Sequence, residues 1–200
     1  MTKILLVRHG ETTYNVEGRI QGWTDSDLTQ HGIETLKATA NLICDKYYKV
    51  YSSSSIRAIL SAVILCQSKS YIGDIYTLHE LKEINLKPWE GQSIEELKKL
   101  DFPHDYITYK SNPSKFIPVA GESLLDVQAR MRRAIEKIAK ENNDTVLIVS
   151  HGAAISSLIN YYKGDPLDDI WKYNVTPASV TELFFEEDKF VSFGKIAYNT

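Results

Sequence analysis

The sequence predicts an α/β fold built on a doubly wound, mainly parallel sheet with helices on both faces. Two continuous apolar runs, residues 4–7 and 145–149, have no helical spacing, which is typical of strands buried on both faces. Segments with helical spacing alternate with such runs along the chain. The 200 residues are 43% hydrophobic and 24% charged, and no linker-like stretch divides them. We therefore expect one domain over residues 1–200.

The first half of the chain is predicted to contain three strands and two helices. The expected elements are a strand at 4–7, a polar loop at 11–27, a helix at 29–47, a strand at 50–52, a helix from 56 onward and a strand at 74–78. Thr29 is the expected cap of the first helix. The apolar positions expected to bury the second helix are Ile56, Ile59, Leu60, Val63, Ile64 and Cys66. Cys44 and Cys66 are expected to be reduced cysteines on buried helix faces.

The second half is predicted to begin with a lid-like insertion at about 84–120. Ser93 and Glu96 form a capping-box pattern for a short helix to about Leu100, whereas residues 101–120 contain three prolines and are expected to be irregular. The elements expected after the lid are a helix at 122–142 capped by Ser123, a strand at 145–149, a helix at 153–162 stopped by Gly164, and a hairpin of 180–185 and 190–193. The charges from Arg130 to Lys140 are expected to form a solvated face.

Charge and hydropathy argue against two classes of partner. A formal net charge of -3 provides no general basic surface, so we expect neither nucleic acid nor an anionic membrane as a partner. No apolar run approaches transmembrane length, and Met1 leads directly into the first strand without a signal-peptide pattern. We therefore expect a cytoplasmic protein, and a homodimer is left open.

Two strands are expected to deliver a histidine to the same edge of the sheet. The run at 4–7 ends in Arg8-His9-Gly10, and the run at 145–149 ends in Ser150-His151-Gly152. Open α/β sheets bind ligands at the carboxyl ends of parallel strands, so both imidazoles are expected at one site. A single histidine at a strand end is more often a structural residue, but the repetition of the pattern favours a functional site.

The arginines near these histidines indicate an anion site. Arg57 falls in the first turn of the helix from 56, where a cation opposes the helix dipole. An anion above the helix start would explain this position, and a solvated arginine is the alternative. Arg8 and Arg57 could hold a dianionic phosphate and leave an imidazole free to act on phosphorus. Loop residues that could line the phosphate, or serve only as surface positions, are Asn15, Gly18, Arg19, Gln21 and Gly22.

Two other chemistries compete with phosphate. Two histidines can bind zinc, but an adjacent arginine repels a cation and no His/Cys/Asp cluster completes either motif, so a metal site ranks below a phosphate site. A serine hydrolase would need a Gly-x-Ser-x-Gly elbow, and the sequence contains none.

Five blocks of the sequence together resemble the histidine phosphatase superfamily, in its phosphoglycerate mutase-like group. The blocks are Arg8-His9-Gly10-Glu11-Thr12, Tyr51-Ser52-Ser53 followed by Arg57-Ala58, Leu81-Lys82-Glu83-Ile84 with Trp89-Glu90-Gly91, Gly121-Glu122-Ser123, and Ser150-His151-Gly152. They span nearly the whole chain in the family's order. Lys87-Pro88 departs from the pattern, because many relatives have a glycine before the Trp-Glu-Gly.

The resemblance implies a role for each candidate. His9 would be the nucleophile that forms a phosphohistidine, and Arg8, Arg57 and His151 would stabilise charge on the phosphoryl oxygens. Glu83 would be the proton donor, with Glu80 as its nearest rival. The residues that would line the phosphate pocket beside these are Asn15, Gln21, Gly22 and Gly152. The family needs neither a metal nor another cofactor.

The expected function is a metal-independent phosphomonoesterase that acts on small phosphorylated metabolites. A cofactor-dependent phosphoglycerate mutase and a non-catalytic phospho-ligand binding protein are the alternatives. The partners expected are a small phosphate monoester and its product, inorganic phosphate. The lid at 84–120 contains no arginine for a second phosphate, although it has lysines at 87, 98, 99, 110 and 115. Its aromatic residues predict an apolar-walled mouth for a sugar or nucleoside-like alcohol: Trp89, Phe102, Tyr106, Tyr109 and Phe116.

Overall fold

The sheet of this computed structural model, which describes residues 1–97, 103–118 and 120–198, is mainly parallel. Within these residues six strands have the order β3-β2-β4-β1-β5-β6. The strands are β1 (Thr2–Arg8), β2 (Lys49–Ser53), β3 (Ile75–Leu78), β4 (Thr145–Ser150), β5 (Val180–Glu186) and β6 (Lys189–Phe193). The first four pair in parallel, and the hairpin of β5 and β6 extends the sheet antiparallel to β1.

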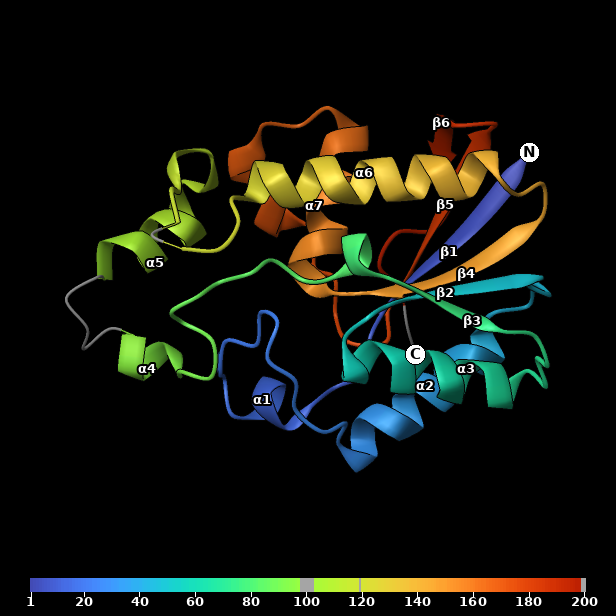
Figure 1. Cartoon of the computed structure of the whole chain (residues 1–200), viewed down its shortest axis with the longest axis horizontal. Helices are drawn as coiled ribbons and strands as arrows, with labels where there is room; N and C mark the ends of the chain where they lie inside the picture. The colour runs from blue at the N-terminus through green and yellow to red at the C-terminus, as the bar shows by residue number, and fades with distance from the viewer. Residues whose placement is uncertain (98–102, 119, 199–200) are drawn as a thin grey trace.

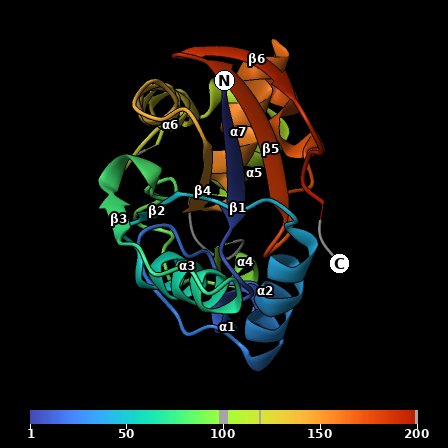
Figure 2. The ribbon, with the colours of Figure 1, turned by 90° about the vertical axis from the view of Figure 1, so that its right-hand side faces the viewer.

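Helices cover both faces of the sheet, which confirms the predicted fold class. The helices are α1 (Thr13–Val16), α2 (Gln30–Leu42), α3 (Ile56–Ser68), α4 (Ile94–Leu97), α5 (Pro103–Ser111), α6 (Leu124–Lys140) and α7 (Gly152–Lys163), with 3-10 turns η1 (His79–Leu81), η2 (Pro113–Lys115) and η3 (Leu167–Lys172). α2 and α3 lie on one face, and α6 and α7 lie on the other (Figure 1, Figure 2). The lid elements α4 and α5 lie beyond the carboxyl ends of the strands, on the left of Figure 1.

Strand β1 divides the hydrophobic core into two layers because its side chains alternate between the faces. Leu5 and Val7 belong to the cluster formed with α2 and α3, whereas Ile4 and Leu6 belong to the cluster formed with α6 and α7. All four side chains are fully buried. Burial of such a side chain contributes about 1.5–3 kcal/mol, so both helical layers are anchored to the strand that ends at the histidine.

The register between β1 and β4 determines where the two histidines lie. Lys3 pairs with Thr145, and five further pairs continue in step to Arg8 and Ser150. His9 and His151 follow the last pair directly, so both imidazoles leave the sheet at the same edge, as predicted. Their ring centroids are 5.2 Å apart.

The helix expected at 29–47 is shorter than predicted. Thr29 caps it through the Gly32 N–H, as expected, but the helix ends at Leu42. Ile43 leaves the helical conformation with φ -73° and ψ 101°, and its side chain enters the core as the chain turns toward β2. The prediction of a buried Cys44 is therefore wrong, because Cys44 lies beyond the helix and is exposed, whereas Cys66 is buried.

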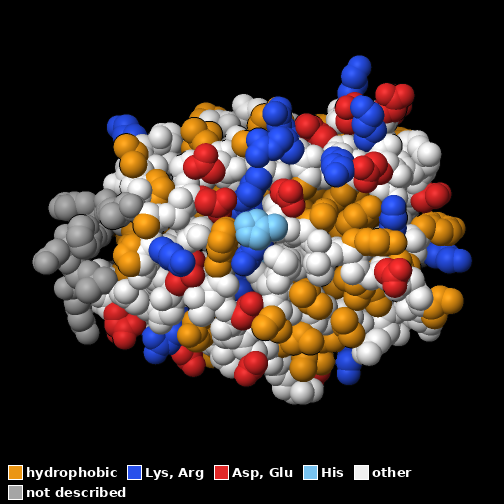
Figure 3. Space-filling view, in the orientation of Figure 1, with side chains coloured by type: hydrophobic (Ala, Val, Ile, Leu, Met, Phe, Trp, Pro, Cys, Tyr) orange, Lys and Arg blue, Asp and Glu red, His pale blue; other side chains and the backbone are white. Residues whose placement is uncertain are grey.

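The buried face of α3 is also different from the predicted one. Ile56 is 61% exposed and Leu60 is 44% exposed, so they do not face the sheet. The buried side carries Arg57 and mostly small side chains, namely Ala58, Ser61, Ala62, Leu65 and Cys66. Small residues let the helix approach its neighbours closely, and burial of the arginine sets the rotation of the helix. Figure 3 shows the hydrophobic side chains that this rotation leaves outside, over α3 and β3.

The lid is more regular than predicted. The capping box of Ser93 and Glu96 is present at the start of α4. Part of the segment expected to be irregular forms α5, which begins at Pro103, a residue that suits the first helical turn because its missing N–H would have no partner there. Leu100, Phe102 and the lysines at 98 and 99 lie outside the described residues.

The second half otherwise agrees with the predicted elements. Ser123 caps α6 in a capping box with Asp126. Gly164 ends α7 in the left-handed conformation, with φ 70°. Among the described residues, no helix is long and apolar enough to cross a membrane.

Candidate active site

His9 presents a neutral imidazole whose lone pair accepts a hydrogen bond from Arg57. Its Nδ1 lies 2.7 Å from the carbonyl oxygen of Gly10, and because a carbonyl only accepts, Nδ1 carries the hydrogen. Nε2 is then the unprotonated nitrogen, and Arg57 Nε points at it from 3.4 Å. Burial, and then the charges of Arg57 and Arg8, hold the pKa of His9 well below its usual value. The imidazole is therefore available as a nucleophile.

His151 lies behind the same edge and has one ring nitrogen without a partner among the described residues. Its Nε2 lies 2.7 Å from Ser53 Oγ, which already accepts the Ser55 N–H and can give its own hydrogen to the ring. Nδ1 then carries a hydrogen, and this buried atom has no partner among the described residues. Burial, followed by Arg57 and His9, lowers the pKa of His151 well below its usual value. An unpaired buried donor is costly unless a ligand accepts from it.

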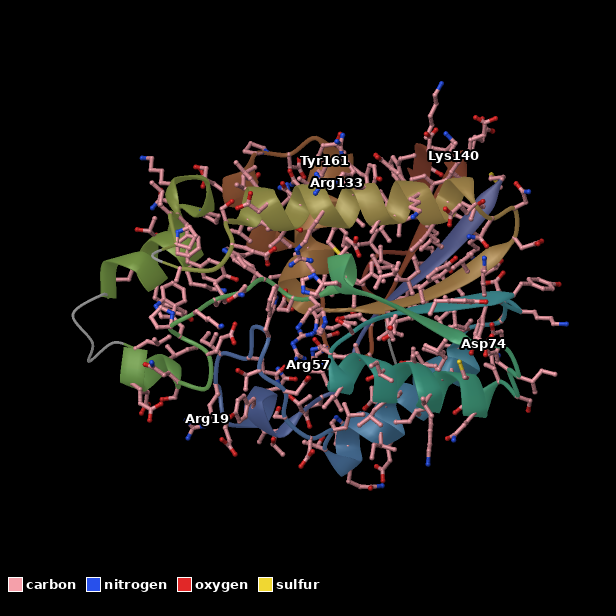
Figure 4. The ribbon with its side chains drawn as sticks, in the orientation of Figure 1. Arg19, Arg57, Asp74, Arg133, Lys140 and Tyr161 are labelled. Carbon is pink, nitrogen blue, oxygen red and sulfur yellow. The ribbon has the colours of Figure 1, made fainter. Side chains whose placement is uncertain are left out.

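Arg57 is buried at the start of α3 and is held by a loop carboxylate. Its Nη1 lies 2.7 Å from Asp25 Oδ1 and 2.9 Å from the Thr24 carbonyl oxygen, and its Nη2 donates to the Gly22 carbonyl oxygen. Asp25 also accepts the N–H groups of Ile56 and Arg57. Figure 4 shows the Arg57 side chain pointing inward from the amino-terminal end of α3.

Asp25 is thus the anion that explains an arginine in the first helical turn. Sequence reasoning expected a bound anion there and did not single out Asp25. No spacing in the sequence relates this loop carboxylate to the helix 31 residues later. Because Asp25 balances the charge and fixes Nη1, while the Gly22 carbonyl oxygen fixes Nη2, Arg57 is a preorganised donor behind His9.

Arg8 supplies a second cation that has an unused donor. Nη1 donates to the carbonyl oxygen of Val175 over 2.7 Å, whereas the buried Nε has no partner among the described residues. Gly152 makes room for this side chain, since a Cβ there would lie 3.2 Å from the guanidinium carbon. Burial lowers the pKa of Arg8, and the Glu83 carboxylate partly offsets this effect.

Glu83 places its carboxylate at the amino terminus of α7. Oε1 accepts the N–H groups of Ile84 and Ala154, and Oε2 accepts that of Ala153, at 3.0–3.1 Å. The positive end of a helix dipole favours a carboxylate at this position. Glu83 lines the same cavity as His9, whereas its rival Glu80 is exposed and does not line it.

Arg130 fixes the backbone that carries Glu83, and the sequence prediction for it is wrong. The sequence predicts a solvated position for it, but the side chain is buried and pairs with Glu122 through Nε and Nη2. Its Nη atoms also donate to the carbonyl oxygens of Glu80, Lys82 and Glu83. The signal was present in the sequence, because position 130 falls beside Val127 and Met131 on the apolar face of the helix.

The loop after β1 brings further predicted residues to the site. Asn15, Gln21 and Gly22 all line the cavity. Asn15 Oδ1 accepts from Thr12, so its amide nitrogen is the atom left for a ligand. Gln21 Nε2 donates to the hydroxyl groups of Thr12 and Ser26. Gly22 has φ +52°, and a Cβ there would collide with Glu90.

These residues share a cavity of about 410 Å³. Arg57 and His151 stand behind its wall, whereas Arg8, His9, Glu83 and Gly152 line it. Its lid side is lined by Tyr106, Tyr109, Lys110, Trp171 and Tyr173. The predicted mouth is thus partly wrong, because Trp89 and Phe116 pack on Tyr109 inside the lid. The cavity wall is completed instead by Trp171 and Tyr173. The only indication of this in the sequence is the aromatic segment that follows Gly164, where α7 ends.

The donor set suits an anion better than a metal ion. Arg8 and Arg57 flank the imidazoles, and no group of three or more His, Cys, Asp or Glu side chains in the described part of the chain could hold a metal. A larger cavity of about 530 Å³ lies between residues 44–48 and 69–73, before the starts of β2 and β3, and its lining has no histidine or arginine. The chemistry therefore belongs to the smaller cavity.

The family assignment follows from comparison with known proteins. The sequence model of the histidine phosphatase superfamily (branch 1) matches residues 4–194. The chain belongs to this superfamily. Phosphoserine phosphatase 1 of Hydrogenobacter thermophilus is 30% identical over 189 residues, which cover 94% of this chain and 88% of that protein. The metal-independent phosphoserine phosphatase of Arabidopsis thaliana is 32% identical over 79% of this chain and 67% of its own length.

A solved structure supports the same assignment. Bacillus stearothermophilus YhfR superimposes with a TM-score of 0.89 and 34% identity, over 96% of this chain and 95% of that chain. The family model spans residues 4–194, so its match includes the segments that carry both histidines.

Replacement of Arg130 by methionine is expected to lower the free energy of unfolding by about 2 kcal/mol, because half-buried Glu122 loses its partner and three carbonyl groups lose their donor. The turnover number should fall about tenfold or more, since the Glu83 carbonyl and its neighbours lose their donor. Urea unfolding and steady-state kinetics measure the two effects. Arg133→Met, on the exposed side of α6 (Figure 4), is the matched control and should change neither quantity.

Proposed function

We propose that this histidine phosphatase hydrolyses small phosphate monoesters without a metal, through a phosphohistidine on His9. The observation that carries the proposal is the neutral His9 imidazole, whose Nε2 lone pair lies beside buried Arg57 at a cavity shared with Arg8 and Glu83. The phosphatase names of its relatives support the reaction class.

In the first step, Nε2 of His9 attacks phosphorus and the bond from phosphorus to the alcohol oxygen breaks. Glu83 takes up the proton that the bound phosphate monoanion carries and gives it to the leaving alcohol oxygen. The unpaired donors Arg8 Nε and His151 Nδ1, together with Arg57, stabilise charge on the phosphoryl oxygens. In the second step, Glu83 takes a proton from water as that water attacks the phosphohistidine. Inorganic phosphate leaves and His9 is neutral again.

In this proposal the wall of the pocket around the phosphoryl group is formed by Asn15, Gln21, Gly22 and Gly152. Asn15 can donate its amide nitrogen to a phosphoryl oxygen, while Gly22 and Gly152 let the loop and α7 approach closely. A cytoplasmic location and a homodimer stay predictions.

Replacement of His9 by alanine should abolish hydrolysis of p-nitrophenyl phosphate, with a loss of at least about 1,000-fold, because no other side chain supplies the nucleophile. The wild type, quenched in alkali during turnover, should carry an acid-labile phosphoryl group that the variant lacks. Near-wild-type activity of His9→Ala would contradict the mechanism. Absence of turnover by the wild type on a broad monoester panel, with binding of one member, would support the non-catalytic alternative.

The pH dependence should reflect the lowered pKa of His9. Since the pKa lies well below 6.5, the imidazole keeps its lone pair as the pH falls through that value. At saturating p-nitrophenyl phosphate, kcat should therefore not decline between about pH 7.5 and about pH 6. A decline with a midpoint near the ordinary histidine value would show that the nucleophile titrates normally.

The mutase alternative makes a different demand on the lid. A mutase must hold a bisphosphate while it reorients, which requires several cations around the second phosphate. Among the described lid residues, Lys110 is the one cation that lines the cavity. Arg19, which lies outside the lid and also lines the cavity, is already paired with Glu17 and Glu96. This supports a phosphatase.

Incubation with 3-phosphoglycerate, with and without 2,3-bisphosphoglycerate, distinguishes the two enzymes. We expect release of inorganic phosphate at a rate that the bisphosphate does not stimulate. Formation of 2-phosphoglycerate, followed beside phosphate, should be negligible. Rapid bisphosphate-dependent isomerisation with little phosphate release would make the protein a mutase.

A further inference from the structure

Lys110 is held in place on the lid side of the cavity. Its Nζ lies 4.1 Å from the centroid of the Trp171 ring, a cation–π distance. The indole is itself fixed, because Nε1 donates to the Tyr109 carbonyl oxygen over 3.0 Å and the ring packs edge-on against Tyr109. Lys110 and Trp171 both line the cavity that contains His9.

The charge of Lys110 has no acidic counterpart among the side chains that the structure describes. Among the described residues, no carboxylate lies within 4 Å of its ammonium group, whereas Arg19 on the same cavity has two acidic partners. Although much of the side chain is exposed, partial burial lowers the pKa of Lys110. A cation beside an aromatic ring at a pocket mouth is stabilised when a ligand brings a negative charge.

Tyr109 adds an unused donor next to this cation. The residue is only 5% exposed, and no described residue forms a hydrogen bond with its hydroxyl group. Burial, and then the nearby Glu83 carboxylate, raise the pKa of Tyr109, so the hydroxyl keeps its hydrogen. Tyr109 lines the cavity, so its hydroxyl is a donor that an acceptor on a bound ligand can use.

We propose that Lys110 and the Tyr109 hydroxyl bind a carboxylate on the alcohol part of the substrate, so that the enzyme prefers phosphorylated carboxylic acids. The inference rests on the proposed function, since His9, Arg8 and Arg57 take the phosphoryl group. A carboxylate has two oxygens that only accept, which match one ammonium and one hydroxyl donor. One unpaired cation balances one negative charge and falls short of a second phosphate.

Two matched substrate pairs test the proposal, because their members differ at the carboxylate. O-phosphoserine is compared with O-phosphoethanolamine, and 3-phosphoglycerate with glycerol 3-phosphate. In each pair kcat/KM should be higher for the carboxylate by about 10–100-fold, the range for a charge-assisted hydrogen bond. Lys110→Met should bring the ratio close to one, mainly through KM, and Lys110→Arg should restore part of it. Tyr109→Phe should reduce the ratio about threefold.

Lys115→Met is the matched control, because Lys115 is an exposed lysine of the same lid that does not line the cavity. It should keep the wild-type ratios. Each ratio is measured within one variant, so a partly unfolded preparation lowers both rates and leaves the ratio unaffected. Equal kcat/KM within the wild-type pairs, or an unchanged ratio in Lys110→Met, would overturn the proposal.

Hydrolysis of p-nitrophenyl phosphate separates this failure from failure of the proposed function. If the wild type hydrolyses it and His9→Ala does not, while the pairs are not distinguished, the phosphatase assignment stands and the carboxylate subsite is wrong. If the wild type hydrolyses no monoester, the proposed function is wrong, and the subsite falls with it.

Discussion

The parallel pairing of β1 with β4 is the constraint on which the rest of the site depends. Six residue pairs in step, from Lys3–Thr145 to Arg8–Ser150, end at the two histidines. A slip of one residue in either strand would turn its core side chains to the opposite face, so the hydrophobic core itself enforces the register. The position of the nucleophile is therefore secured by the same burial that stabilises the sheet.

Burial at this sheet edge has a consequence for charge. Two guanidinium groups lie against two imidazoles, and their fields act together with desolvation to keep both rings neutral. The cations in turn require compensation, which Asp25 gives to Arg57 and Glu83 gives to Arg8. Glu83 accordingly contributes to the electrostatic balance of the resting site as well as to the proposed proton transfers.

The sequence was informative wherever one local rule determined the structure. Continuous β-branched runs identified β1 and β4, and side-chain caps identified Thr29 and Ser123 as helix starts. Motif positions predicted one site for His9, Glu83 and His151; His9 and Glu83 line one cavity, and the His151 ring lies beside that of His9. Those patterns are short in range, so they are readable without tertiary structure.

The errors arose where a distant partner decided the outcome. The rotation of α3 depends on the ion pair between Arg57 and Asp25, which lies in a different loop. The spacing of apolar residues in α3 does not indicate this pair. In the sequence Arg130 is one of many charges on its helix; its burial is favourable because it pairs with Glu122 and with three carbonyl groups of residues 80–83. The cavity wall from η3 was missed for the same reason, because only the folded chain brings Trp171 to Tyr109.

Tyr109 and Lys110 are neighbours in the chain, yet mutation should be constrained very differently at the two positions. The Tyr109 ring packs against Trp89, Phe116 and Trp171, so its aromatic character belongs to the core of the lid. The Lys110 side chain ends on the surface of one indole. During divergence, charge at position 110 can therefore change at little cost to folding, while position 109 is restrained. If Lys110 binds the substrate as proposed, exchange of this one surface cation would shift the substrate range while the aromatic packing around Tyr109 stays intact.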